Sequence, residues 1–164
     1  MFTINRLNHA VLYVRNAERA ADFYRNVMGF ETVEALGDRA FFLRANGSDN
    51  HHDLGLFGIG EDAPPPGHGD RVGLYHLAWE VDDLTDLAEA RSALAEAGAL
   101  TGESDHGNSL SIYCADPDGN EFEVFWMVPR EEWETRGFGT RRLDLQGELE
   151  RRGMAGAGAS PDAG

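Results

Sequence analysis

Hydrophobic and polar residues alternate in several short stretches of the chain, and this spacing predicts strands. The first stretch is residues 7–14, which is rich in branched and aromatic side chains. Apolar positions at helical spacing follow Asn16, a typical helix N-cap, so we expect a helix that ends near Gly29. Three more extended stretches complete this part of the chain: 30–36, 40–45 and 53–59.

The same order of patterns recurs after residues 61–70, a segment rich in Pro and Gly. An alternating stretch at 72–81 precedes an amphipathic helix at 84–97. Three extended stretches then follow: 100–103, 110–115 and 121–128.

The sequence therefore predicts an α+β fold with two tandem βαβββ modules, residues 5–60 and 71–129, joined by a Pro/Gly linker at 61–70. Each module alone has an exposed sheet edge and a bare face. We expect the two to join into one curved mixed sheet around a cleft, with the helices outside. Residues 1–129 would then form a single domain.

Beyond residue 129 the composition changes. Residues 130–152 hold six basic and six acidic side chains, which predicts a charged helical extension on the surface or on a partner chain. Residues 153–164 are mostly Gly, Ala, Ser and Pro, a composition typical of a disordered tail.

Composition excludes several kinds of chemistry. The chain has 29 acidic and 14 basic residues, and all 14 basic residues are Arg. Because there is no Lys, a Lys Schiff base and a P-loop are excluded. The net charge of -15 argues against a nucleic-acid binder. One cysteine, Cys114, excludes an intrachain disulfide and a CxxC site. No apolar run predicts a membrane span or a leader, so we expect a cytoplasmic protein.

Histidines stand at matching places in the two modules. His9 and His76 each lie on the first strand of a module, and a pseudo-twofold axis would make them face each other. Glu123 lies on the last strand. Two imidazoles and one carboxylate form the open metal site of non-haem Fe(II) oxygenases. Taken singly, each histidine is also compatible with an ordinary hydrogen-bonded polar residue, and Glu123 with a solvated face.

Residues 105–123, DHGNSLSIYCADPDGNEFE, carry the most specific pattern. A tyrosine, Tyr113, precedes Glu123 by ten residues, and a DPDGN turn at 116–120 lies between them. This stretch resembles the fingerprint of extradiol dioxygenases in the vicinal oxygen chelate superfamily, which also contains glyoxalases and bleomycin-resistance proteins. The resemblance covers about residues 7–127.

The resemblance implies a divalent metal on His9, His76 and Glu123. Fe(II) fits the extradiol branch best, and Mn(II), Zn(II) or Ni(II) are alternatives. The segment HHDLGL at 51–56 is similar to one that supplies a catalytic histidine, here His52. The other residues that the resemblance implies are Tyr113 and His106 as further catalytic residues, with weaker substrate contacts from His51 and Asn108.

The implied function is that of a metal-dependent extradiol-type dioxygenase, which cleaves the ring of a catechol-like aromatic diol with O2. Such an enzyme is an oxidoreductase of aromatic degradation. We expect the protein to be a homodimer. Two alternatives stay open. One is a glyoxalase-like lyase, isomerase or transferase. The other is a non-enzymatic drug-binding protein of the bleomycin-resistance kind, in which an acidic cleft would bind a cationic drug, and the net charge of -15 fits that. Classical extradiol enzymes carry an additional pair of modules that this chain lacks, and a single two-module chain is typical of glyoxalases and resistance proteins as well. The exact diol, the metal, and whether the site forms within one chain or across a dimer stay open as well.

Overall fold

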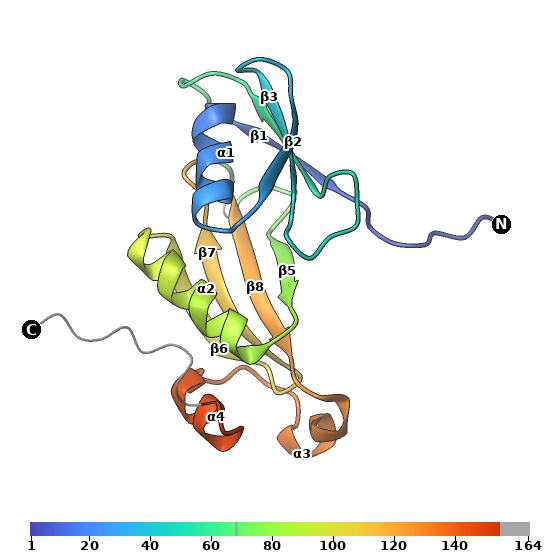
Figure 1. The fold of residues 1–164 in the computed structure, drawn as a ribbon, viewed down its shortest axis with the longest axis vertical. Helices are drawn as coiled ribbons and strands as arrows, with labels where there is room; N and C mark the ends of the chain where they lie inside the picture. Colours follow the sequence, from blue (N-terminus) through green and yellow to red (C-terminus); the bar gives the residue numbers. More distant parts are fainter. Residues whose placement is uncertain (68, 155–164) are drawn as a thin grey trace, which may run out of the picture. The chain divides into compact units, whose positions relative to one another are not determined.

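The computed structural model describes residues 1–67 and 69–154 of the chain. The tail predicted at 153–164 therefore lies, from residue 155 onward, outside the described residues. The chain divides into two compact units (Figure 1). Unit 1 comprises residues 1–66 and 116–119, and unit 2 comprises residues 67–115 and 120–164.

Unit 1 is a four-stranded mixed sheet with one helix. The strand order is β1-β4-β3-β2, in which β1 and β4 are parallel and the other neighbours antiparallel. Its elements are β1 (Ala10–Val14), α1 (Ala17–Asn26), β2 (Glu31–Ala35), β3 (Ala40–Arg44) and β4 (Leu54–Gly58).

The helix of unit 1 forms where the sequence predicts it. The side chain of Asn16 accepts a hydrogen bond from the backbone N–H of Arg19 at 3.0 Å, which satisfies one of the free donors of the first turn. Gly29 adopts a φ of 72° after the helix, a conformation that favours glycine. The helix buries Ala20, Ala21 and other residues and contacts β3 and β4, so one face of the sheet is covered.

Unit 1 also includes the turn at 116–119, which α1 and the residue after β1 hold in place. Asp118 is almost fully buried and pairs with Arg15 at 3.1 Å and with Arg19 at 3.3 Å. The backbone N–H of Arg15 also donates to Asp118 at 3.1 Å. The Tyr24 hydroxyl donates to Asp116 at 3.4 Å. The turn is therefore fixed by charge-assisted hydrogen bonds.

Unit 2 repeats this arrangement. The strand order is β5-β8-β7-β6, with β5 and β8 parallel and the other neighbours antiparallel. Its elements are β5 (Leu77–Val81), α2 (Leu84–Glu96), β6 (Leu100–Asp105), β7 (Ser109–Ala115), β8 (Glu121–Met127), a 3-10 turn at Arg130–Glu132, α3 (Trp133–Arg136) and α4 (Leu145–Arg151).

The core of unit 2 lies between its sheet and α2, which runs along one face of the sheet (Figure 1). Alternate residues of β8 are buried, as are Leu110, Ile112 and Cys114 of β7, and Leu84, Leu87 and Leu94 of α2 are fully buried. Cys114 lies among the buried positions of β7. Because side chains alternate along a strand, Tyr113 and Glu123 point to the opposite face of the sheet. That face carries the polar residues considered below.

The prediction of an α+β fold with two βαβββ modules is confirmed. Two strands begin later than predicted: β1 begins at Ala10 and not at residue 7, and β5 begins at Leu77 and not at residue 72. His9 and His76, which were predicted to lie on these strands, directly precede them. The reason is the partner strand. Ala10 pairs with Leu54, the first residue of β4, and Leu77 pairs with Phe122, the second residue of β8. Residues 7–9 and 72–75 therefore lie beyond the start of the partner strand. A single curved sheet made of both modules stays a prediction.

The extension at 130–152 is helical only in short pieces, with an irregular stretch at 137–144. Its Leu143 and Leu149 are buried, and α4 contacts α2, so the extension packs on unit 2. Among the described residues, no helix has the length and apolarity that a membrane crossing requires.

Candidate functional site

The predicted site residues are divided between the two units. Unit 1 holds His9, His51 and His52, and unit 2 holds His76, Glu123 and the other candidates on β7 and in the loop before it. Among residues 1–67 and 69–154, no three His, Cys, Asp or Glu side chains form a cluster able to hold a metal ion. Within each unit, the structure brings several of the predicted residues together, and each group is described by itself below.

His9 directly precedes β1 and is oriented by a chain of hydrogen bonds. Its Nδ1 lies 2.9 Å from Oδ1 of Asn8, whose Nδ2 donates to Asn50 at 3.0 Å. Nδ2 of Asn50 donates in turn to the carboxylate of Asp53 at 2.7 Å. Asp53 is buried, so the chain ends on a fixed group. A histidine whose Nδ1–H is bonded to an amide oxygen presents its Nε2 as a metal ligand.

His52 lies against His9 and is partly enclosed by aromatic rings. The ring centroids of His52 and His9 are 4.6 Å apart, and Phe42 lies 5.2 Å away in an edge-on contact. Burial lowers the pKa of His52, and nearby His9 and His51 lower it further. The His52 imidazole is therefore neutral at neutral pH, the form that accepts a proton.

His51 is exposed and lies beside His52, with their Nδ1 atoms 3.0 Å apart. Its ring meets that of His52 edge-on at 5.3 Å. The described contacts thus make His51 a neighbour of the predicted catalytic histidine.

His76 and Glu123 lie together on the face of the unit 2 sheet opposite α2, and their side chains are 28% and 13% exposed. Glu123 pairs across the sheet with Ala78 of β5, and His76 stands two residues before Ala78, on the same face. His76 Nε2 lies 3.2 Å from Glu123 Oε2. Two donor atoms bound at right angles to one metal, each about 2.1 Å from it, are about 3 Å apart. The pair therefore fits two neighbouring positions of one metal ion.

Tyr113 stands directly opposite Glu123 in the β7–β8 pairing. Burial raises the pKa of the Tyr113 hydroxyl, and the negative charge of Glu123 raises it further. The hydroxyl is thus protonated at neutral pH and is available as a hydrogen-bond donor. It lies 2.6 Å from Nε2 of His106, a short hydrogen bond.

His106 stands in the turn between β6 and β7. Its backbone N–H donates to the Ser109 carbonyl at 2.9 Å, and its Nδ1 lies 3.4 Å from Oγ1 of Thr140. Asn108 is half-buried in the same turn, where its carbonyl accepts a hydrogen bond from Val128 at 3.0 Å. The described hydrogen bond of Asn108 is thus structural and leaves its predicted substrate contact untested.

Four residues around these groups were not predicted: Asn8, Asn50, Asp53 and Thr140. Asn8 and Asn50 are 42 residues apart in the sequence, so no local pattern indicates that they interact. Asp53 follows the histidine pair at 51–52 and was interpreted only as part of a motif. Thr140 lies in the charged extension, where composition gives no signal.

A family model described as the Glyoxalase/Bleomycin resistance protein/Dioxygenase superfamily matches residues 6–124. The chain is 33% identical, over 152 residues, to a catechol-2,3-dioxygenase of Bacillus subtilis (strain 168), covering 90% of this chain and 52% of that protein. It is 30% identical to a manganese-dependent 2,3-dihydroxybiphenyl 1,2-dioxygenase of Geobacillus genomosp. 3, over 77% of this chain and 38% of that one. The chain thus spans about half the length of the first relative and less of the second.

Solved structures show the same fold. A glyoxylase/bleomycin resistance protein/dioxygenase domain from Frankia sp. EAN1pec superimposes with a TM-score of 0.64 and 21% identity. The match covers 77% of this chain and all of that domain.

Proposed function

Because the chain belongs to the Glyoxalase/Bleomycin resistance protein/Dioxygenase superfamily, we propose that it is an extradiol-type dioxygenase that cleaves a catechol-like aromatic diol with O2. The observation that carries the proposal is the group of residues on the face of the unit 2 sheet opposite α2. There the His76–Glu123 pair stands beside the Tyr113–His106 hydrogen bond, so a metal-binding pair and a proton-donating pair share one face. The two relatives described above, both named as dioxygenases of aromatic diols, support it.

A divalent metal ion would be held by His9, His76 and Glu123. Nitrogen and carboxylate ligands without thiolate suit Fe(II) and Mn(II), with Zn(II) and Ni(II) as weaker alternatives. When bound, such a metal chelates both oxygens of a catechol, favours loss of their protons and brings O2 next to the ring. The hydrogen-bonded Nδ1 of His9 and the spacing of the other two ligands fit this arrangement.

His52 would act as the general base and then as the general acid. Its lowered pKa keeps the imidazole neutral, so it accepts a proton from a diol hydroxyl at neutral pH. It would return that proton to an oxygen of the product. Its edge-on contact with Phe42, at 5.2 Å between ring centroids, would limit the positions of the ring.

Tyr113 would donate a hydrogen bond to the oxygen of the substrate that carries the developing charge. Its raised pKa keeps the proton on the hydroxyl. His106 would orient that hydroxyl through the 2.6 Å contact. Glyoxalase-like and drug-binding functions do not require this set of a base, a phenol and a second imidazole, and we therefore favour dioxygenase chemistry over both.

The test is anaerobic reconstitution of the apoprotein with Fe(II), and separately with Mn(II) and Zn(II), followed by a panel of catechols and admission of O2. We expect oxygen uptake and a yellow ring-cleavage product with Fe(II) or Mn(II). Glu123→Ala should lose both metal and activity. Glu121→Ala, which removes the carboxylate two residues earlier on the same face of β8, is the matched control and should retain both. Absence of turnover across the panel with metal bound would falsify the proposal.

A further inference from the structure

The charged extension, residues 130–152, makes backbone contacts with the turn that carries His106. We call it the C-terminal strap. Asp105, the last residue of β6, exchanges two backbone hydrogen bonds of 2.9 Å each with Arg141. On the other side of His106, Gly107 lies so close to the strap that a Cβ atom there would be 1.8 Å from the carbonyl oxygen of Gly137. The residues before and after His106 are thus both in contact with strap backbone.

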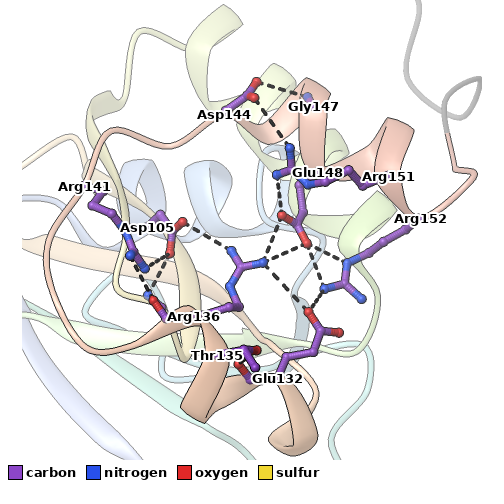
Figure 2. A network of polar contacts seen from close by, with 11 residues as sticks. Asp105, Glu132, Thr135, Arg136, Arg141, Asp144, Gly147, Glu148, Arg151 and Arg152 are labelled. Carbon is purple, nitrogen blue, oxygen red and sulfur yellow. Dashed lines mark hydrogen bonds and ion pairs between the residues drawn. The ribbon is translucent and has the colours of Figure 1, made fainter.

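A buried carboxylate, that of Glu148, connects the first part of the strap to its last helix. Glu148 on α4 is 3% exposed and receives hydrogen bonds from Arg136 at 3.0 Å, Arg151 at 2.6 Å and Arg152 at 2.8 Å (Figure 2). Arg152 also bonds Glu132 at 2.8 Å. These charge-assisted contacts join residues 132–136, near the start of the strap, to residues 148–152 at its end.

Arg136 connects this network to the turn. One of its terminal nitrogens bonds Glu148, and the other pairs with the side chain of Asp105 at 3.2 Å (Figure 2). The Arg136 side chain is only 17% exposed, so the connection is shielded from solvent. Arg141 adds a second contact to the same carboxylate at 3.6 Å. The residue next to His106 is therefore held by two arginines of the strap.

The strap also reaches the imidazole. Thr140 Oγ1 lies 3.4 Å from His106 Nδ1, whereas the opposite nitrogen, Nε2, lies 2.6 Å from the Tyr113 hydroxyl. A group bonded to one nitrogen of a histidine biases which nitrogen carries the proton, and so which role the other nitrogen has. The contacts thus run from Thr140 through the imidazole to the phenol.

We propose that the C-terminal strap is a positioning element for the Tyr113–His106 pair, with Thr140 and Arg136 as its positioning residues. Thr140 biases the tautomer of His106, and Arg136 fixes the turn at Asp105. The consequence for the reaction, a hydroxyl aimed at the substrate, rests on the proposed function. The positioning itself is a property of the metal-free protein.

The test compares full-length Thr140→Val, Thr140→Ser and Arg136→Gln with the control Thr135→Val. Thr135 lies in the same strap but bonds only the nearby Glu132 carbonyl at 2.9 Å among its described contacts. In the metal-free proteins, 15N chemical shifts of the His106 ring report its tautomer. We expect Thr140→Val and Arg136→Gln to change these shifts, and Thr140→Ser and Thr135→Val to keep them.

The second measurement is the steady-state rate after reconstitution. Loss of an outer hydrogen-bond partner costs about 10- to 100-fold. Because the contact to Thr140 is long, we expect kcat to fall about tenfold in Thr140→Val and to recover in Thr140→Ser, with KM changed less. Circular dichroism separates these effects from loss of folding, and Thr140→Val still tests the proposal if Arg136→Gln fails to fold.

The outcomes separate this inference from the proposed function. If the His106 shifts change in Thr140→Val but the wild-type protein cleaves no diol, the strap is a positioning element and the dioxygenase proposal is rejected. Active enzyme with unchanged His106 shifts in folded Thr140→Val overturns the inference and leaves the dioxygenase in place.

Discussion

Unit 1 and unit 2 share more than their strand order. Each sheet has one irregularity in register, between Thr32 and Glu34 in β2 and between Leu100 and Gly102 in β6. In both units the irregularity falls on the first of the three antiparallel strands. The histidines also match, because His9 and His76 each directly precede the first strand. The two units can therefore be compared residue by residue.

The comparison shows where they differ. In unit 2, Glu123 of β8 pairs with Ala78 of β5 on one side and with Tyr113 of β7 on the other. At the corresponding position of unit 1, Gly55 of β4 pairs with Val11 of β1 and with Phe42 of β3. Phe42 correspondingly takes the place of Tyr113. One framework thus carries a carboxylate and a phenol, whereas the other carries no functional group at either position.

The two units therefore share a backbone arrangement but not the functional groups that it carries. Both units offer a histidine at the start of a sheet, but only unit 2 adds the carboxylate opposite it. Unit 1 instead adds His52 and the hydrogen-bond chain from Asp53. This asymmetry predicts one metal ion per chain and a division of roles between the units.

The largest expected effect is loss of the metal when either matched histidine is removed. If both bind one ion, His9→Ala and His76→Ala should each weaken Fe(II) binding by more than the roughly 100-fold cost of an outer-shell partner. The double variant should lose less affinity than the sum of the two single losses, because residues that act as a unit are not additive. Calorimetric titration and metal content measure this, with His51→Ala as the control that retains metal. If His9→Ala retained a full complement of metal, His9 would not be a metal ligand.

The next effect concerns the group that unit 1 adds. His52→Phe should retain the metal and lose about 100-fold or more of kcat, because general acid–base catalysis contributes at least that much. The base is active when neutral, so kcat/KM should fall as pH decreases through its pKa. Because that pKa is lowered, the fall should lie below pH 6.5, and the variant should lack it. A pH profile that keeps this acidic limb in His52→Phe would assign the base to another residue.

Unit 2 also includes the C-terminal strap. The buried Glu148 of the strap should make the stability of the protein depend on pH. Burial opposes ionisation of Glu148, but hydrogen bonds from Arg151, Arg136 and Arg152 outweigh it and lower its pKa from 4.5 to about 2. A lowered carboxyl pKa contributes stability that is present above pH 4.5 and is lost as pH falls toward 2. Glu148→Gln should therefore reduce the free energy of unfolding by about 2 kcal/mol at pH 7, the range of a hydrogen bond to a charged group.

The difference between Glu148→Gln and wild type should shrink as the pH is lowered below 4.5. Urea unfolding between pH 7 and pH 3 measures it, with Glu150→Gln as a matched control on the exposed side of α4. A difference that stays constant with pH would show that packing, and not charge, carries the contribution of Glu148.

The sequence predicts the strands to within a few residues, because alternation follows from burial of one face of each sheet. It overextends β1 and β5, since residues 7–9 and 72–76 continue the strand pattern but are not paired with a neighbouring strand. It also points to the residues on which our proposed site rests, such as His76 and Glu123, because motif spacing depends on neighbours along the chain.

The supports of those residues could not be predicted. The bond from Asn8 to Asn50 spans 42 residues, and that from Arg136 to Asp105 spans 31. Such pairs arise from the way strands and loops meet, and neither residue type carries a local signal of its partner. The match between Gly55 and Glu123 also appears only once the register of both sheets is known.

The smallest expected effect comes from making the two units alike at one position. Tyr113→Phe gives unit 2 the residue that unit 1 has in Phe42, and we expect about a tenfold loss of kcat, which corresponds to about 1.4 kcal/mol, the upper range of one hydrogen bond to the substrate. The metal should stay bound, because Glu123 and His76 are unchanged. Adding Phe42→Tyr should restore nothing, since the residue opposite Phe42 is Gly55, not a metal-binding carboxylate. Stopped-flow measurement of ring cleavage compares the three proteins, and recovery of the rate in the double variant would mean that the two positions are interchangeable after all.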